Sequence, residues 1–221
     1  MTLFYRIWDL PTRLFHWLLV ICVLGLIITG NIGGLWMDWH FRFGYAVLCL
    51  LVFRVLWGFV GGYWSRFVTF VYSPSSLLHY LRGRSPLLHR VGHNPLGALS
   101  VFALLAALCV QVFSGLLSDD EIFHRGPWAV WASYDLIEMA SRYHKQVGKF
   151  VVLGLVVLHL LALVFYKVVK RQALVHSMVS GDKSLDSDVP VSADAAPQRI
   201  KAVVVFAISV VITYGLVNLA L

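Results

Sequence analysis

Five long runs of hydrophobic residues, with almost no charge inside them, set the pattern of this chain. They lie between Arg13 and Asp38, Arg42 and Arg66, Arg90 and Asp119, Lys149 and Lys167, and from Ala202 to Leu221. A helix needs about 20 residues to cross the hydrocarbon core of a bilayer, where lipid offers the backbone no hydrogen-bond partners. The runs therefore predict five transmembrane helices, the fourth of which begins before its uncharged part, near His144.

The composition agrees with a membrane protein. Of the 221 residues, 59% are hydrophobic and 13% are charged, whereas a soluble domain has about 45–50% apolar and about 25% charged residues. Aromatic residues make up 14% of the chain, which excludes a disordered protein. The net charge of +7 comes from basic residues that flank the apolar runs, so it indicates membrane flanks and no nucleic-acid partner.

Basic residues gather on two of the segments that connect the predicted helices. They are Arg66, Arg82, Arg84 and Arg90 after the second helix, and Lys167, Lys170 and Arg171 after the fourth. Because loops rich in Lys and Arg stay in the cytoplasm, we expect a cytoplasmic N-terminus and a C-terminus on the outer side. Residues 172–198, rich in Ser, Asp, Ala and Pro, are then a polar cytoplasmic linker.

Cysteine usage excludes several kinds of site. Cys22, Cys49 and Cys109 each lie inside an apolar run, and no two of them form a CxxC pair. This argues against disulfides, against a zinc site and against a c-type haem, which needs CxxCH. The nine histidines are the unusual entry in the composition, because ionisable residues inside a membrane are costly to bury and usually functional.

Four histidines fall at two matched depths of the predicted helices. His16 lies at the cytoplasmic end of the first helix and His40 at the outer start of the second, while His144 and His159 lie 15 residues apart on the fourth. In an α-helix, 15 residues give a net rotation of about 60° and a rise of about 22 Å. His159 is then level with His16, and His144 is level with His40.

Two imidazoles facing each other across an apolar slot suit the axial positions of a b-type haem. A zinc site would gather four ligands at one depth, copper would more often recruit Cys or Met, and a proton relay would need Asp or Glu in the helices. A single histidine of this kind can also be an ordinary polar residue at a helix end. Four at matched depths favour two haems, an inner one held by His16 and His159 and an outer one held by His40 and His144.

Two further residues have alternative interpretations. Arg54, about 21 Å along the second helix from His40, has no carboxylate nearby in sequence terms and could pair with a haem propionate or snorkel to the cytoplasmic headgroups. His93 heads the third helix before Asn94 and Pro95. It is either a competing ligand near the inner propionates or a quinone headgroup, or an interfacial residue or helix cap.

Four segments carry a family resemblance. They read RIWDLPTRLFHWLL, WHFRFGYAVLCLLVFRVLWGFVG, GHNPLGALSV and HKQVGKFVVLGLVVLHLLALV, and together they span roughly residues 5–170. The chain resembles the bacterial di-haem cytochrome b561 family, which includes the cytochrome b subunits of nickel–iron hydrogenases. The resemblance implies two haem b groups ligated by His16, His40, His144 and His159, a supporting role for Arg54, and a place in the bacterial inner membrane.

The expected fold class is all-α: an integral membrane helix bundle with a four-helix di-haem core and a fifth, C-terminal transmembrane helix. Residues 1–171 form the predicted di-haem cytochrome b domain, 172–198 the cytoplasmic linker and 199–221 the fifth helix. That helix lies outside the family's four-helix core, so an anchor for a specific partner is one interpretation. Membrane lipid is the expected surroundings, and association with a second copy or another subunit is compatible with the sequence.

Ligation of each haem by two histidines leaves no open iron position, so electron transfer is the expected chemistry and no residue is assigned as catalytic. We expect a subunit that carries electrons between a membrane quinone pool and a periplasmic partner, such as a cytochrome c or a dehydrogenase or hydrogenase subunit. The alternative is a stand-alone quinone-linked oxidoreductase acting on a small reductant such as superoxide, attracted by Arg125, Arg142, Lys145 and Lys149. A non-redox scaffold is disfavoured by the paired histidines.

Overall fold

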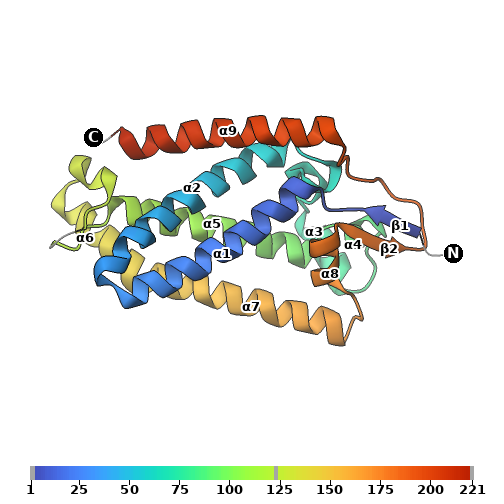
Figure 1. Ribbon diagram of the computed structural model, residues 1–221. Helices are drawn as coiled ribbons and strands as arrows, with labels where there is room; N and C mark the ends of the chain where they lie inside the picture. Colours follow the sequence, from blue (N-terminus) through green and yellow to red (C-terminus); the bar gives the residue numbers. More distant parts are fainter. Residues whose placement is uncertain (1–2, 122–123, 220–221) are drawn as a thin grey trace. The chain divides into compact units, whose positions relative to one another are not determined.

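The computed structural model describes residues 3–121 and 124–219. The first two residues of the predicted cytochrome domain (1–2) and the last two of the predicted fifth helix (220–221) lie outside the described residues. Among the described residues, five helices are long and apolar enough to cross a membrane (Figure 1). They are α1 (Leu10–Ile32), α2 (Met37–Val60), α5 (Pro95–Leu117), α7 (Lys149–Val168), which continues from α6 (Tyr134–Arg142), and α9 (Ala196–Asn218). The predicted all-α membrane helix bundle is confirmed.

The shorter elements connect these helices. They are the strands β1 (Leu3–Arg6) and β2 (Asp182–Leu185), the helices α3 (Pro74–Leu81), α4 (Leu88–Val91) and α8 (Leu174–Ser180), and the 3-10 turns Gly34–Trp36, Tyr63–Ser65, Phe67–Thr69 and Pro127–Trp131. Among the long helices, α2 is the most enclosed. Half of the residues in its most apolar stretch are buried, whereas the share in the other four helices is 11–17%. Apolar side chains exposed to this extent need lipid around them.

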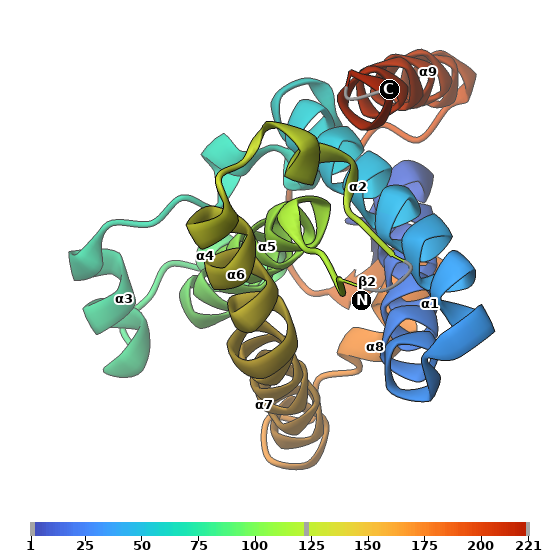
Figure 2. The same cartoon turned by 90° about the vertical axis from the view of Figure 1, so that its left-hand side faces the viewer.

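The fourth predicted helix is continuous but not α-helical throughout. Between α6 and α7, residues Tyr143–Gly148 form a π-helical turn, and Figure 2 shows α6 running directly into α7. Hydrogen bonds from i to i+5 accommodate an additional residue and are frequent at functional sites. The predicted offset of about 60° between His144 and His159 assumed 100° per residue, a value that this turn does not keep.

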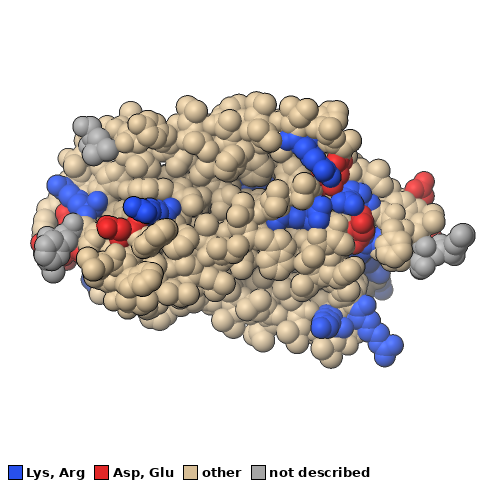
Figure 3. All heavy atoms as spheres, viewed as in Figure 1, with Lys and Arg blue, Asp and Glu red and all other residues tan. Residues whose placement is uncertain are grey.

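Two compact units make up the chain, and each is described by itself. The first unit comprises Met1–Phe15, Arg54–Ala103 and Val157–Val205, and the second comprises His16–Phe53, Leu104–Val156 and Phe206–Leu221. The first unit holds 13 Lys and Arg against five acidic residues, a net charge of +8, and the second holds five against six, a net charge of −1. Figure 3 shows that the charged side chains gather in patches and leave much of the face in view without charge.

In the first unit, the chain's N-terminal segment pairs with the predicted linker. β1 and β2 are antiparallel, with Leu3 opposite Leu185, Phe4 opposite Ser184, Tyr5 opposite Lys183 and Arg6 opposite Asp182. A small core of Ile7, Trp8, Trp64, Val91 and Val189 packs beside this ribbon. Residues 172–198 therefore include a short helix, a strand and a buried valine, none of which their polar composition predicted.

Two charged residues of this linker segment fasten it to the rest of the first unit. The Asp194 carboxylate pairs with Arg6 at 2.9 Å and accepts a hydrogen bond from the backbone N–H of Leu10 at 3.0 Å. The Lys183 ammonium donates to the carbonyl oxygens of Arg90 and Val91, both at 3.0 Å, at the end of α4. Burial lowers the pKa of Lys183, and the two carbonyl oxygens supply the hydrogen bonds that its buried amine needs.

A buried carboxylate organises the start of α1 in the first unit. Asp9 is fully buried, and its oxygens accept hydrogen bonds from Thr12 N at 2.9 Å, Gly62 N at 3.1 Å and Ser65 Oγ at 2.8 Å. The indole N–H of Trp57 also donates to it, at 3.3 Å. Asp9 thus caps α1 as an N-cap residue and at the same time joins α1 to the end of α2 and the turn that follows.

Close packing joins the helices of the second unit. A Cβ atom on Gly25 of α1 would lie 2.6 Å from the ring of Phe43 in α2, so the glycine is needed for this approach. The indole N–H of Trp128 donates to the carbonyl oxygen of Leu216 in α9 at 2.7 Å. The rings of Phe53 and Phe206 also meet, with centroids 6.2 Å apart. The fifth helix therefore packs within this unit.

Candidate cofactor-binding site

A cavity of about 440 Å³ lies within the second unit. Its volume falls in the range of about 300–1,000 Å³ that is typical of ligand sites. The walls are mostly apolar and come from α1, α2, α5 and the start of α7. The lining also includes polar residues, which are Asn31, His40, Gln111, Ser118, Asp119, Asp120, His124, His144, Lys145 and Lys149.

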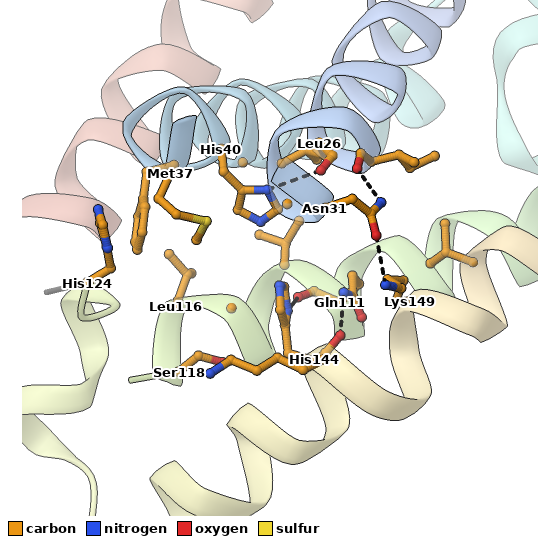
Figure 4. A pocket seen from close by; sticks show the side chains of 18 of the residues that line it. Leu26, Asn31, Met37, His40, Gln111, Leu116, Ser118, His124, His144 and Lys149 are labelled. Atoms are coloured by element: carbon orange, nitrogen blue, oxygen red, sulfur yellow. Dashed lines mark hydrogen bonds between the residues drawn. The ribbon is translucent and has the colours of Figure 1, made fainter. Parts of the chain in front are cut away.

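The outer pair of predicted histidines meets in this cavity. The ring centroids of His40 and His144 are 6.1 Å apart, and the two ring planes are nearly perpendicular at 85°. His40 comes from the first turn of α2 and His144 from the π-helical turn. Figure 4 shows the two rings pointing toward one another. The depth matching inferred from the sequence is therefore realised for this pair.

Backbone carbonyls fix how both imidazoles present their nitrogens. The Nδ1 atom of His40 lies 3.2 Å from the carbonyl oxygen of Leu26, and Nδ1 of His144 lies 2.9 Å from that of Gln111. A carbonyl oxygen only accepts, so each Nδ1 carries the proton and each Nε2 keeps its lone pair. This arrangement, with Nδ1–H held by a second-layer acceptor, is the one that metal-ligating histidines use.

Two glycines let neighbouring helices approach the histidine rings. A Cβ atom on Gly30 of α1 would lie 2.9 Å from Cε1 of His40, and one on Gly115 of α5 would lie 2.8 Å from Cε1 of His144. Real side chains do not tolerate such contacts, so any larger residue would push the rings away. Gly44 also lines the cavity, and a Cβ atom there would meet nothing within 4 Å, which leaves its wall flat.

The donor set fits a macrocycle better than a bare metal ion. Among residues 3–121 and 124–219, no group of three or more His, Cys, Asp or Glu side chains could hold a metal, whereas a protein zinc site uses three or four. A haem iron brings its own four equatorial nitrogens and needs only axial ligands. Two imidazole nitrogens that each lie about 2 Å from a metal place their ring centroids roughly 6 Å apart. His40 and His144 therefore fit the axial positions of a haem.

The inner pair of predicted histidines is divided between the units. His16 lies on the part of α1 that belongs to the second unit, with its ring edge-to-face against Trp17 at 5.1 Å. His159 lies half-buried on the part of α7 that belongs to the first unit. The pairing of His16 with His159 stays a prediction.

Arg54 is buried rather than snorkelling. Its side chain is only 3% exposed, and its guanidinium carbon lies 4.6 Å from the ring centroid of Phe67 and 5.8 Å from that of Phe70. The expectation that no carboxylate lies near Arg54 is wrong, because Asp9 in the same unit attracts it electrostatically. Within the described residues, no ion pair joins the two groups, and Nη1 of Arg54 is buried without a hydrogen-bond partner.

His93 stands in an aromatic setting of the first unit. Its ring packs between Trp8, with centroids 4.7 Å apart, and Phe70, at 4.4 Å. Its carbonyl oxygen accepts a hydrogen bond from the hydroxyl of Tyr72 at 2.8 Å. The cap of α5 is Asn94, whose side-chain oxygen accepts from Gly97 N at 2.8 Å. Of the interpretations left open by the sequence, the capping role thus goes to the neighbouring residue.

Gln111 is the contributor that the sequence interpretation missed. Its carbonyl oxygen binds Nδ1 of His144, and its side-chain amide donates to the carbonyl oxygen of His144 at 3.0 Å. Both ends of the residue therefore orient the same histidine. The signal in the sequence was the amide side chain of Gln111 within a long, mostly apolar run. A polar group inside a membrane is costly to bury unless it has a partner or a function.

Comparison with known proteins finds one matching family and several relatives with closely similar names. The profile of the prokaryotic cytochrome b561 family matches residues 7–181. Three relatives are named as probable B-type cytochrome subunits of Ni/Fe-hydrogenases. The protein of Bradyrhizobium diazoefficiens is 24% identical over 211 residues, covering 80% of this chain and 85% of the relative. That of Azotobacter vinelandii is 26% identical over 219 residues, covering 83% and 90%. That of Escherichia coli K12 is 23% identical over 216 residues, covering 81% and 91%.

No solved structure matches the chain significantly. The family match nevertheless begins just before α1 and ends just after α8, so it covers most of the 221 residues. It includes His40 and His144 as well as His16, His159 and Arg54. The chain belongs to the prokaryotic cytochrome b561 family.

Proposed function

We propose that this chain is a transmembrane electron-transfer subunit with two haem b groups, each held by two histidines. The outer haem takes His40 and His144 as axial ligands, and the inner haem takes His16 and His159. The observation that carries the proposal is the outer pair, in which both Nδ1 atoms bind backbone carbonyls and both rings face one cavity. Family membership supports the haem b type of cofactor.

The residues around the cavity hold and tune the cofactor. When bound, haem supplies reversible one-electron transfer at its iron. His40 and His144 would hold the haem iron between them, so neither oxygen nor substrate would have an open position on the metal. The carbonyls of Leu26 and Gln111 fix the imidazole tautomers and raise their basicity as ligands. Gly30 and Gly115 leave the space that the two rings occupy, since a Cβ atom at either position would collide with a ring.

Arg54 supports the inner site. It is a buried cation with an unsatisfied N–H, next to aromatic rings that cannot neutralise it. A propionate would complete its hydrogen bonds by the charge-assisted pairing that arginine favours. The nearby Asp9 already uses its oxygens for four donors, so it is not free to take this role.

The charge of the connecting segments supports an orientation in the bacterial inner membrane. The basic residues after α2 and around the end of α7 would face the cytoplasm; they are Arg66, Arg82, Arg84 and Arg90, and Lys167, Lys170 and Arg171. The outer haem would then exchange electrons with a periplasmic partner, and the quinone pool would be the other redox partner. The names of the relatives favour a hydrogenase-type partner over a cytochrome c and a subunit over a stand-alone oxidoreductase.

Electron transfer across a sealed membrane tests this proposal. We expect liposomes that contain the purified protein and trapped ferricyanide to lose the ferricyanide absorbance when dithionite is added outside. Liposomes with the His144→Ala variant, and liposomes without protein, should both show only the slow background rate, because the outer site is needed to complete the path. Equal rates for the wild type and the protein-free liposomes would contradict the function.

A further inference from the structure

Among the described charged side chains that line the cavity of the second unit, the cations lack an acidic partner whereas the carboxylates each have a basic one. Four charged side chains line it: Asp119, Asp120, Lys145 and Lys149. Lys145 is exposed and Lys149 is half-buried, so an unpaired ammonium on either residue can still take an anionic partner. Which of these charges are already compensated therefore decides what kind of ligand group the rim can receive.

Both carboxylates of the lining are engaged by residues of the outer loop. The guanidinium of Arg125 pairs with Asp119, with Nε 3.2 Å from Oδ2. Asp120 accepts hydrogen bonds from the backbone N–H of His124 at 2.8 Å and approaches Nδ1 of its ring at 3.2 Å. These contacts turn the acidic groups toward the loop and away from any further cation.

The two lysines have no such compensation. Within the described part of the chain, no carboxylate lies within 4 Å of the ammonium of Lys145 or Lys149. The Lys149 ammonium donates to the side-chain oxygen of Asn31 at 3.1 Å (Figure 4), and a neutral amide leaves the charge intact. Lys145 directly follows His144 in the π-helical turn Tyr143–Gly148, and Lys149, four residues later, is the first residue of α7.

We infer that Lys145 and Lys149 anchor the propionate carboxylates of the outer haem at the mouth of the cavity. This inference rests on the proposed function, because it takes as given that a haem lies between His40 and His144. A haem of this type carries two carboxylates, and charge-assisted hydrogen bonds from ammonium groups are the strong partners for them. The two cations equal the two carboxylates in number and have the opposite charge. Both cations lie within five residues of the proposed ligand His144.

Lysine-to-glutamine variants of the purified, haem-loaded protein test the anchor. In Lys145→Gln and Lys149→Gln, we expect the resonance Raman propionate bending band of the outer haem to shift. We also expect haem transfer to excess apomyoglobin to accelerate roughly tenfold per lysine, which corresponds to the loss of one charge-assisted hydrogen bond. Lys149→Arg should restore the slow transfer, since it returns a cationic donor.

Arg142→Gln is the matched control. It removes one positive charge close to the same turn, from an exposed residue that does not line the cavity. It should leave the propionate band and the transfer rate unchanged. The inference is overturned if the lysine variants leave both readouts at wild-type values, or if Arg142→Gln changes them equally. A lysine variant that alters only the reaction with an added small anion would assign the rim to a diffusible reductant instead.

The failure of this inference is distinguishable from the failure of the function. If the wild-type protein contains no haem, or if its spectrum is unaffected by loss of His144, the proposed function itself is wrong. If haem is bound through His144 and the propionate band does not respond to the lysines, only the anchor is wrong.

Discussion

A His144→Ala variant is expected to lose the outer haem and keep the inner one. The reduced-minus-oxidised spectrum of the purified variant should retain about half of the wild-type α-band absorbance per chain, because one of two bis-His sites is lost. Substitution would remove one of the two proposed ligands of the outer haem and would also leave the carbonyl of Gln111 without its imidazole partner. His40→Ala should have the same effect, since both histidines would share one iron.

The double variant and a third histidine sharpen this test. Combining His40→Ala with His144→Ala should cause no further loss, because residues of one site are not additive. His124→Ala is the control: His124 lines the same cavity, but its ring is engaged with Asp120, and it should retain both haems. Full haem content in His144→Ala, or equal loss in His124→Ala, would refute the assignment of the outer ligands.

An Asp9→Ala variant is expected to destabilise the first unit by about 3 kcal/mol or more. Asp9 is fully buried, and removal of its carboxylate leaves the N–H groups of Thr12, Gly62 and Trp57 and the hydroxyl of Ser65 without their acceptor. Each unsatisfied buried polar group costs about 1–3 kcal/mol, and loss of the N-cap of α1 adds to this. Thermal unfolding of the detergent-solubilised protein measures the effect as a lower midpoint.

Asp186→Ala provides the comparison for this variant. Asp186 is an exposed acidic residue of the same unit, so its removal changes the net charge equally without opening a buried site. Surface substitutions of this kind usually change stability by less than about 0.5 kcal/mol. Coincident unfolding curves for Asp9→Ala and the wild type would show that the buried network does not stabilise the protein.

The fold class and the proximity of His40 and His144 were predictable from the sequence because both follow from local rules. Apolar runs of sufficient length fold as membrane helices wherever they occur, and the five predicted helices are present. The meeting of His40 and His144 follows from their depth: His40 lies in the first turn of α2 and His144 in the π-helical turn just before α7. The rise per residue sets that depth, and it is insensitive to the exact rotation of the helix.

Other features depend on contacts between distant parts of the chain. The pairing of Leu3–Arg6 with Asp182–Leu185 joins segments about 180 residues apart, and neither segment has a strong strand pattern by itself. The position of Asp9 beneath α2 and near Arg54 likewise arises only from tertiary packing. The π-helical turn at His144 is a third case, because the helical periodicity on either side of it continues without an interruption in the sequence.

The haem content of the purified wild-type protein decides whether the chain carries two haem b groups. A pyridine haemochrome assay, with the protein quantified independently by amino-acid analysis, identifies the haem type and gives the number of haems per chain. We expect two haem b groups per chain that dithionite reduces. They should not bind carbon monoxide, because two histidines would occupy both free positions of each iron. A protein without haem, or one whose reduced spectrum shifts with carbon monoxide, would contradict this expectation.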